Sequence, residues 1–235
     1  MSKIYAIILA GGTGLRMGSE VPKQFLSLSN LPVMVHTILA FQNHHRVNSI
    51  MVVIHQEYIN KIKKYKQDYN LSKIKKIIKG GKTRQESSYN AITGYRFSNE
   101  DILLFHDAAR PLISDDIIEL TIEETIAHNA VNVCVETSDT IVQRDENDII
   151  VAMPQRNQLR NSQTPQAFRF EIIKKAHEYA RQTNFTETTD DVRLVMNIGH
   201  PVKIIKGNLK NIKITTPIDM LLAEAIISNR KKRGE

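Results

Sequence analysis

The chain has 235 residues, of which 41% are hydrophobic, and its formal net charge is +7. This size and composition suit one α/β domain with a buried core, and no linker or repeat divides residues 1–235. There is no apolar run of membrane-spanning length and no signal-peptide pattern, and the lone Cys134 excludes an intrachain disulfide, so we expect a cytoplasmic protein that does not contact membranes.

Short apolar runs alternate with segments of helical periodicity along most of the chain. The predicted strands are Ile4–Leu9, Ile50–Ile54, Ile74–Ile78, Ile102–His106, Ala130–Glu136 and Val202–Lys206. The predicted helices are Pro32–Phe41, Gln56–Tyr69, Arg84–Tyr95, Asp115–His128, Phe170–Gln182, Asp190–Ile198 and Pro217–Ile227. This alternation indicates a mostly parallel sheet with helices on both faces, in which ligands bind at the carboxyl ends of the strands.

The first predicted strand runs into a glycine loop, Gly11-Gly12-Thr13-Gly14, which Arg16 and Lys23 follow. The peptide N–H groups of such a loop can face an anion, so the segment predicts a triphosphate site. A tight turn with two solvated cations is the simpler alternative. Met17 stands where a dinucleotide fingerprint needs glycine, and the Gly-Lys-Ser/Thr of a Walker loop is absent.

Two further polar segments directly follow predicted strands. In His106-Asp107-Ala108-Ala109-Arg110-Pro111, the Asp107 carboxylate can hold Mg²⁺ and Arg110 can pair with phosphate or polyol oxygens. Gly80–Ser87 opens a helix, and Ser87 or nearby amides can read a base edge, although Thr83 and Ser87 also fit as helix-capping residues. The eight histidines show no metal-ligand spacing.

Residues 139–163 interrupt the alternation of strands and helices. They contain two extended pieces, Thr140–Gln143 and Ile149–Ala152, joined by the polar turn at 145–148. Because an isolated hairpin is marginally stable in water, we expect something else to cover it, such as a second copy of the chain. Later polar elements lie at 163–166, 188–191 and 211–217, where Asp190 and Thr216 are candidate helix caps.

Together these motifs resemble the cytidylyltransferases that act on small polyol phosphates. The similarity runs from Ala6 to about Ala225 and rests on motifs in the family's order and spacing. They are Leu9-Ala10-Gly11-Gly12-x-Gly-x-Arg-Met-Gly, Pro22-Lys23-Gln24-Phe25, His106–Pro111, Asp139-Thr140, Gln163-Thr164-Pro165-Gln166 and Asn211-Ile212-Lys213. The resemblance implies a single Rossmann-like nucleotide-diphospho-sugar transferase domain with a protruding β-arm at 139–163.

The resemblance also implies a set of site residues. Arg16 and Lys23 would be catalytic, and CTP would contact Ala10, Gly11, Gly12, Thr13, Gly14, Gly81, Lys82, Ser87, Asp107 and Ala108. Lys82 stands where the family often has an acidic residue. Asp107 would hold Mg²⁺, and the acceptor would lie against Asp107, Arg110, Thr140, Arg156, Thr164, Thr189 and Lys213. Thr140 and Arg156 would reach the site of a second subunit in a homodimer.

The expected reaction is attack of the acceptor's phosphate oxygen on the α-phosphorus of CTP, with release of pyrophosphate. It brings two anions together, so cations supply most of the catalysis. The sequence motifs point to two different types of acceptor. Asp139-Thr140-Ile141-Val142 and Pro154-Gln155-Arg156 lean to D-ribitol 5-phosphate, whereas 188–191 and 211–217 look more like the 2-C-methyl-D-erythritol 4-phosphate enzymes.

Two other functions stay open from the sequence. A sugar-1-phosphate nucleotidyltransferase that uses UTP, GTP or dTTP would share the glycine loop. A nucleic-acid binder would explain the basic charge at Lys61–Lys79 and Arg230–Arg233, but these runs lack the interleaved aromatic residues of single-strand binders, so we expect no nucleic-acid partner.

Overall fold

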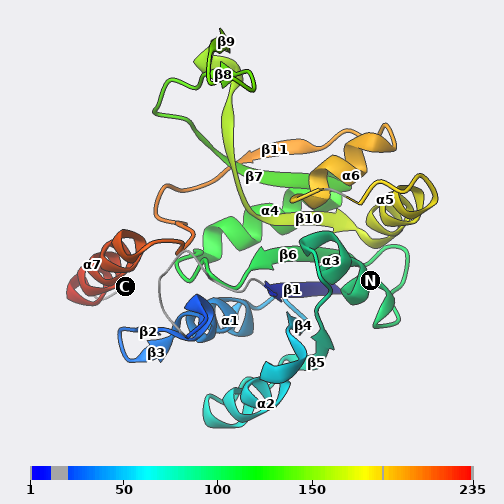
Figure 1. Cartoon of the computed structure of the whole chain (residues 1–235). Helices are drawn as coiled ribbons and strands as arrows, with labels where there is room; N and C mark the ends of the chain where they lie inside the picture. Colours follow the sequence, from blue (N-terminus) through cyan, green and yellow to red (C-terminus); the bar gives the residue numbers. More distant parts are fainter. Residues whose placement is uncertain (1, 12–20, 187, 234–235) are drawn as a thin grey trace.

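The computed structural model describes residues 2–11, 21–186 and 188–233, and within them seven strands form one sheet in the order β11-β7-β10-β6-β1-β4-β5 (Figure 1). The strands are β1 (Ile4–Ala10), β4 (Ser49–Ile54), β5 (Ile74–Lys79), β6 (Ile102–Asp107), β7 (Ala130–Glu136), β10 (Arg160–Arg169) and β11 (Lys203–Lys206). All pair in parallel except β10, which is antiparallel to both β6 and β7. The prediction of a mostly parallel sheet is confirmed.

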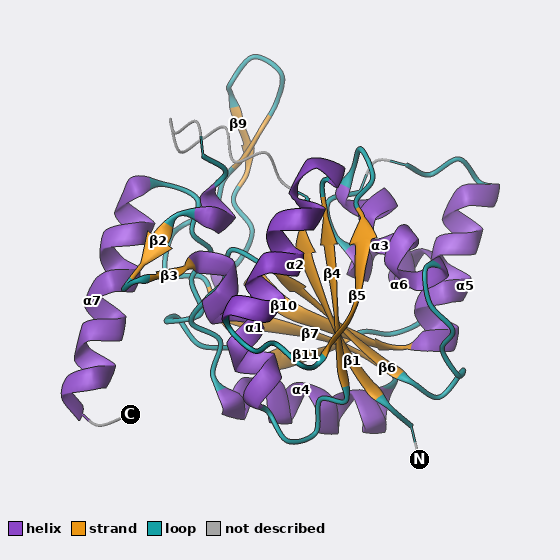
Figure 2. Ribbon diagram, turned by 90° about the horizontal axis from the view of Figure 1, so that it is seen from below, coloured by secondary structure: helices purple, strands orange, loops and turns teal. Residues whose placement is uncertain are grey.

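Helices cover both faces of this sheet because its strands are apolar on both sides (Figure 2). Alternate β1 residues such as Ile8 pack with α1 (Val33–Asn43), α2 (Ile59–Asp68) and α4 (Asp115–His128). The intervening ones, such as Ile7, pack with α3 (Arg84–Thr93), α5 (Phe170–Gln182) and α6 (Asp191–Asn197). A smaller cluster seats α7 (Pro217–Arg233) against Leu28 and Leu112. Among the described residues no helix is both long and apolar enough to cross a membrane.

The strand β10 is absent from the prediction, which took Gln163–Gln166 for a polar element that could form a turn or a helix cap. Proline argues against a central strand because it cannot donate to the ladder. The structure accommodates Pro165 at an irregularity, since the pairing of β10 with β7 shifts register between Ser162 and Gln166. The polar pattern therefore marks a bulge inside a central strand.

Residues 137–159 leave the sheet and carry the hairpin of β8 (Gln143–Arg144) and β9 (Ile150–Ala152), which projects from the body of the molecule (Figure 1). The chain returns through the 3-10 helix η4 (Arg156–Gln158). The predicted hairpin is thus present. The strand β10 begins at Arg160, so the last residues of the expected arm span, 139–163, belong to this strand.

The remaining short elements are the hairpin β2 (Ser27–Leu28) and β3 (Leu31–Pro32) and the 3-10 helices η2 (Lys23–Phe25) and η3 (Gln56–Tyr58). The β2–β3 hairpin was not predicted. Asp190 caps α6 as expected, because its carboxylate accepts from the Val192 amide at 2.8 Å.

Candidate functional site

Three of the segments predicted to form the site meet at one edge of the sheet. The Ala108 amide, just beyond β6, donates to the Leu9 carbonyl near the end of β1 at 2.9 Å. A Cβ on Gly11 would lie 3.3 Å from the Ser87 hydroxyl, so the loop after β1 also approaches the loop after β5. Gly11 therefore provides the close contact that a larger residue would crowd.

The Gly80–Ser87 loop is held by its own side chains. Ser87 Oγ accepts from the Gly81 amide at 3.0 Å and donates to the Thr83 carbonyl at 2.9 Å. Thr83 caps α3 by accepting from the Glu86 amide, and Glu86 in turn accepts from the amide of the exposed Lys82 at 2.7 Å. The capping interpretation of Thr83 is confirmed. The Ser87 hydroxyl shapes the loop whose amides were predicted to face CTP.

The carboxylate of Asp107, at the end of β6, is the centre of a charged cluster. Its Oδ2 atom accepts from Lys213 Nζ at 2.9 Å and from Arg110 Nε at 3.4 Å. Arg110 also donates through Nη1 to the Asn211 carbonyl at 2.8 Å. The fold thus joins the predicted acceptor residues of the β6 end to those of the loop before α7.

The cations around Asp107 determine its charge. Burial by itself would raise the pKa of this carboxyl, but Arg84, Lys213 and Arg110 outweigh burial and hold the pKa well below its usual range. Asp107 is therefore ionised at neutral pH. Arg110 and Lys213, two cations in contact with this one carboxylate, leave positive charge available for a bound anion.

Arg84 is a site residue for which no role was predicted. Its guanidinium pairs with the buried Asp191 at 2.8 Å, and Ser88 and His177 bond to the same carboxylate at 3.0 and 3.2 Å. Burial alone would raise the pKa of Asp191, but Arg84 and these bonds lower it overall. Although Arg84 lies within the Gly80–Ser87 motif, its partner is more than 100 positions away in the sequence, and only the fold shows the pair.

Thr164 lies beside the cluster, as expected, and its hydroxyl accepts from the Asp107 amide at 3.2 Å. Thr189 is exposed just before the cap of α6. Arg156 and Thr140 lie on the arm, where Arg156 donates to the Ser138 carbonyl at 3.3 Å. This contact of Arg156 is local to the arm.

The predicted phosphate loop is described only in part. Ala10 is buried, and its carbonyl accepts from Gln24 Nε2 at 3.1 Å. Lys23 lies in η2. Burial would raise the pKa of Asp219, but hydrogen bonds from Thr216 and Thr215 lower it, and Lys23 adds a smaller contribution in the same direction. Gly12, Thr13, Gly14 and Arg16 lie outside the described residues.

Two other features are separate from this edge. Among the described residues, His44, His45 and Glu119 form one group close enough to hold a metal, which sequence spacing did not indicate. However, Arg46 ion-pairs with Glu119, and His44 Nδ1 accepts from the Arg46 amide, which places the ring proton on Nε2. We therefore interpret the group as an Arg46–Glu119 ion pair with the two histidines beside it.

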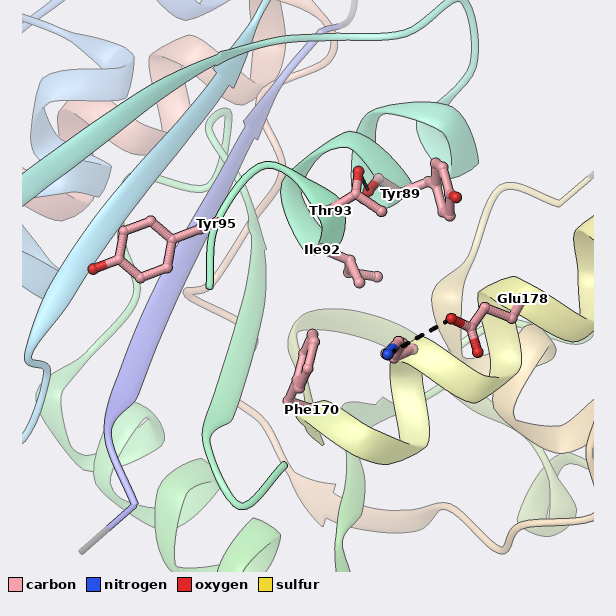
Figure 3. Close-up of a pocket in the computed structure, with 7 residues that line it drawn as sticks. Tyr89, Ile92, Thr93, Tyr95, Phe170 and Glu178 are labelled. Carbon is pink, nitrogen blue, oxygen red and sulfur yellow. Dashed lines mark hydrogen bonds and ion pairs between the residues drawn. The ribbon is translucent and has the colours of Figure 1, made fainter. Parts of the chain in front are cut away.

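A hollow between α3 and α5 is the second feature (Figure 3). Ile92 and Phe170 form its apolar wall, and Lys174 and Glu178 pair across one turn of α5 at 3.8 Å. None of the predicted site residues lines it. The hollow is therefore distinct from the charged edge around Asp107.

Comparison with known proteins gives consistent matches over nearly the whole chain. The family model described as IspD, 2-C-methyl-D-erythritol 4-phosphate cytidylyltransferase, matches residues 4–229. Curated enzymes of that name from Clostridium botulinum (strain ATCC 19397 / Type A) and Pelotomaculum thermopropionicum are 39% and 38% identical. The alignments cover 97% and 99% of this chain, respectively, and 98% of each relative.

Solved structures agree with these matches. The 4-diphosphocytidyl-2C-methyl-D-erythritol synthase of Anaerococcus prevotii DSM 20548 superposes with a TM-score of 0.83 at 27% identity, covering 97% of this chain and 99% of that one. The Francisella tularensis 2-C-methyl-D-erythritol 4-phosphate cytidylyltransferase gives 0.81 at 30% identity, with coverage of 95% and 99%.

The Arg84–Asp191 pair gives the first prediction. We expect Asp191→Asn to lower the free energy of unfolding by about 3–5 kcal/mol, because it leaves a mostly buried guanidinium without its anion. The matched control is Asp148→Asn at the exposed Arg144–Asp148 pair, which should change little. Urea unfolding at neutral pH measures both.

The same pair predicts a pH dependence. The pKa of Asp191 is lower in the folded chain than its ordinary value of 3.8, so its contribution is present above that value and is lost as the pH falls through the folded-state pKa. The stability difference between wild type and Asp191→Asn should therefore narrow below about pH 4. Equal losses in both Asn variants at neutral pH would contradict the role given to this pair.

Proposed function

Because this chain belongs to the 2-C-methyl-D-erythritol 4-phosphate cytidylyltransferase family and is therefore a CTP-dependent cytidylyltransferase, we propose that its acceptor is 2-C-methyl-D-erythritol 4-phosphate. The product would be the cytidine diphosphate derivative of methylerythritol, an intermediate of isoprenoid biosynthesis. The observation that carries the proposal is the Asp107–Arg110–Lys213 cluster at the carboxyl end of the parallel strands. The family membership of the chain gives this cluster its proposed role.

This choice of acceptor replaces the preference for D-ribitol 5-phosphate that the sequence motifs suggested. That preference rested on short stretches of the arm, at 139–142 and 154–156. The family model spans 4–229, and the relatives reported above all carry the methylerythritol name, so similarity along the whole chain favours the alternative over the ribitol interpretation. A role in capsule or teichoic acid synthesis has no corresponding support.

We place CTP at the loops after β1 and β5. The backbone of Gly11 through Gly14 would surround the triphosphate, while Gly81, Lys82 and Ser87 lie on the side where the base would bind. Support comes from the approach of Gly11 to Ser87 and from the internal bonding that preorganises the Gly81–Ser87 loop. Arg16 and Lys23 would stabilise the charge that develops at the α-phosphorus.

We place the acceptor at the Asp107 cluster. Arg110 and Lys213 offer N–H donors to its phosphate, and both are held against the Asp107 carboxylate before any substrate binds. Thr164 borders the same region from β10. We also assign the exposed Thr189, next to the cap residue of α6, to the acceptor. Ala108 contributes backbone beside the CTP loop.

The oxygen chemistry of Asp107 fits a magnesium ion. Mg²⁺ is usually held by one or two carboxylates together with substrate phosphates, and this carboxylate is ionised and contacts the cations of the proposed phosphate site. Asp107 would hold the ion through its carboxylate, whose Oδ2 atom also takes the contacts from Arg110 and Lys213. When bound, the ion would neutralise charge on the phosphate oxygens.

The residues around the acceptor phosphate and the CTP triphosphate would position these two groups for reaction. A phosphate oxygen of the acceptor attacks the α-phosphorus of CTP, the bond to the β-phosphate oxygen breaks, and pyrophosphate leaves. No protein nucleophile is required. Arg110 and Lys213 would hold the attacking phosphate in line, and Arg16 and Lys23 would offset repulsion between the two anions.

We further propose that the arm completes the site of a second subunit. Its apolar side chains Ile149, Ile150, Val151 and Met153 are each more than half exposed, which is costly for a free surface in water. Thr140 and Arg156 lie on the same arm, which projects from the body of the molecule (Figure 1). Pairing of two arms would bury the apolar residues and carry Thr140 and Arg156 to the partner.

The second prediction concerns the acceptor. With CTP and Mg²⁺, we expect pyrophosphate release with 2-C-methyl-D-erythritol 4-phosphate at a kcat/KM at least about a hundredfold above that with D-ribitol 5-phosphate, a difference of roughly 2.7 kcal/mol. A coupled pyrophosphate assay measures both, and a panel of UTP, GTP and dTTP serves as the nucleotide control. Preference for ribitol phosphate would return the acceptor to the first interpretation.

The third prediction concerns catalysis by Lys23. Lys23→Ala should lower kcat by about 10²–10³-fold, because a preorganised charge that acts on the transition state is worth about 2.7–4 kcal/mol. The exposed Lys174, which pairs with Glu178 away from the site, gives the matched control Lys174→Ala, for which kcat should stay at the wild-type value. Near-normal turnover in Lys23→Ala, with the fold intact by circular dichroism, would remove Lys23 from the mechanism.

The fourth prediction tests the shared site. Arg156→Ala and Lys213→Ala should each be poorly active alone, whereas the two variants, unfolded together and refolded as a mixture, should recover about a quarter of wild-type activity. Half of the dimers are then mixed, and each mixed dimer has one intact site. Sedimentation of the wild type as a monomer, or absence of recovery in the mixture, would exclude the shared site.

A further inference from the structure

His106 immediately precedes Asp107 in β6, and its ring is fully buried. The proposed chemistry does not use this ring. Its exposed fraction is 0%, it is the penultimate residue of β6, and its ring packs 5.1 Å from the ring of Phe41. A buried polar ring needs partners for both nitrogens, and each unpaired group would cost about 1–3 kcal/mol.

Both ring nitrogens contact groups that hold the site. Nε2 lies 3.1 Å from the Arg110 carbonyl, and Nδ1 lies 2.9 Å from Thr164 Oγ1. The same Thr164 oxygen accepts from the Asp107 amide at 3.2 Å. A continuous chain of hydrogen bonds thus connects the backbone of Asp107, the hydroxyl of Thr164, the ring of His106 and the backbone of Arg110.

The donor and the acceptor of each of these hydrogen bonds follow from the two backbone groups at the ends of the series, the Asp107 amide and the Arg110 carbonyl. A carbonyl can only accept, so the His106 proton that faces Arg110 is on Nε2. Nδ1 of the neutral ring is then an acceptor, and the Thr164 hydroxyl must donate to it. The Asp107 amide can only donate, and it does so to a lone pair of the same hydroxyl. Every donor in the chain is matched by one acceptor.

A second proton on the ring would break this match. Protonated Nδ1 would face the Thr164 oxygen as a donor and force the hydroxyl proton to turn away. The neutral ring with its proton on Nε2 is therefore the form that satisfies both contacts.

We propose that His106 is a positioning residue that fixes Asp107 and Arg110 relative to each other for binding of the acceptor phosphate. The ring pulls the Arg110 carbonyl inward, on a turn already closed by the bond from the Arg110 amide to the Asp107 carbonyl at 3.0 Å. The Arg110 side chain is thereby directed outward to Asp107 and to the Asn211 carbonyl. A rigid ring sets this spacing more closely than a flexible side chain can. The inference rests on the proposed acceptor site.

Three variants separate the two ends of the hydrogen-bonded chain. His106→Phe keeps an aromatic ring against Phe41 and removes both bonds. His106→Asn has an oxygen near the position of Nδ1 and is too short to reach Arg110, whereas His106→Gln can reach the Arg110 carbonyl. Leu104→Ala is the control for simple loss of stability, because Leu104 is fully buried in β6 and packs in the same core cluster as Phe41.

We expect His106→Phe to lower kcat/KM for 2-C-methyl-D-erythritol 4-phosphate by about 10–100-fold, with the KM for CTP changed less than about threefold. His106→Gln should recover more of the loss than His106→Asn, because it restores the bond to Arg110. Leu104→Ala should lower the melting temperature and leave both kinetic constants near the wild-type values. Wild-type constants in a folded His106→Phe would overturn the proposal.

Nitrogen-15 NMR of the wild-type histidine rings tests the hydrogen-bonded chain without any turnover. We expect the neutral His106 ring to carry its proton on Nε2, with Nδ1 as the acceptor. A proton on Nδ1 would overturn the proposal even if no variant folded. If the wild type is inactive with 2-C-methyl-D-erythritol 4-phosphate, the proposed function fails. The NMR spectrum still shows which nitrogen of His106 carries the proton.

Discussion

The charged site of this enzyme depends on one carboxylate, that of Asp107, kept ionised at the end of a buried strand. A lone buried carboxylate would be protonated because burial disfavours the charged form. Here Lys213 at 2.9 Å, Arg110 at 3.4 Å and the more distant Arg84 outweigh that penalty. Removal of the carboxylate would leave these cations to repel one another, so the anion and the cations maintain each other's positions.

This arrangement suits a reaction between two phosphates. Cations that would bind an acceptor phosphate must keep their positions before the phosphate arrives. Asp107 and the Asn211 carbonyl hold Arg110 in place, and the paired Asp191 holds Arg84. The side chains are therefore oriented in the free protein, which reduces the reorganisation needed at the moment of reaction.

The antiparallel strand β10 is the structural element that makes this cluster possible. It lies between β6 and β7, and the irregularity around Pro165 places the Thr164 hydroxyl next to the Asp107 amide. The end of β6 is then bonded on one side to β1 through Ala108 and Leu9 and on the other to β10 through Thr164. The two proposed substrate positions thus share one rigid edge.

The sequence by itself was sufficient for the parallel strands, most helices, the arm hairpin and the cytidylyltransferase class, because these depend on local periodicity and on short motifs whose residues are contiguous. Asp107 and Arg110 were found in this way, as neighbours at a strand end. The sequence missed β10, since Pro165 hides a strand whose bulge is visible only against β7. The tertiary structure also decided the partners of Arg84, His106 and Asn211, because each of them contacts a residue from 47 to 107 positions away and no local pattern encodes such a pairing.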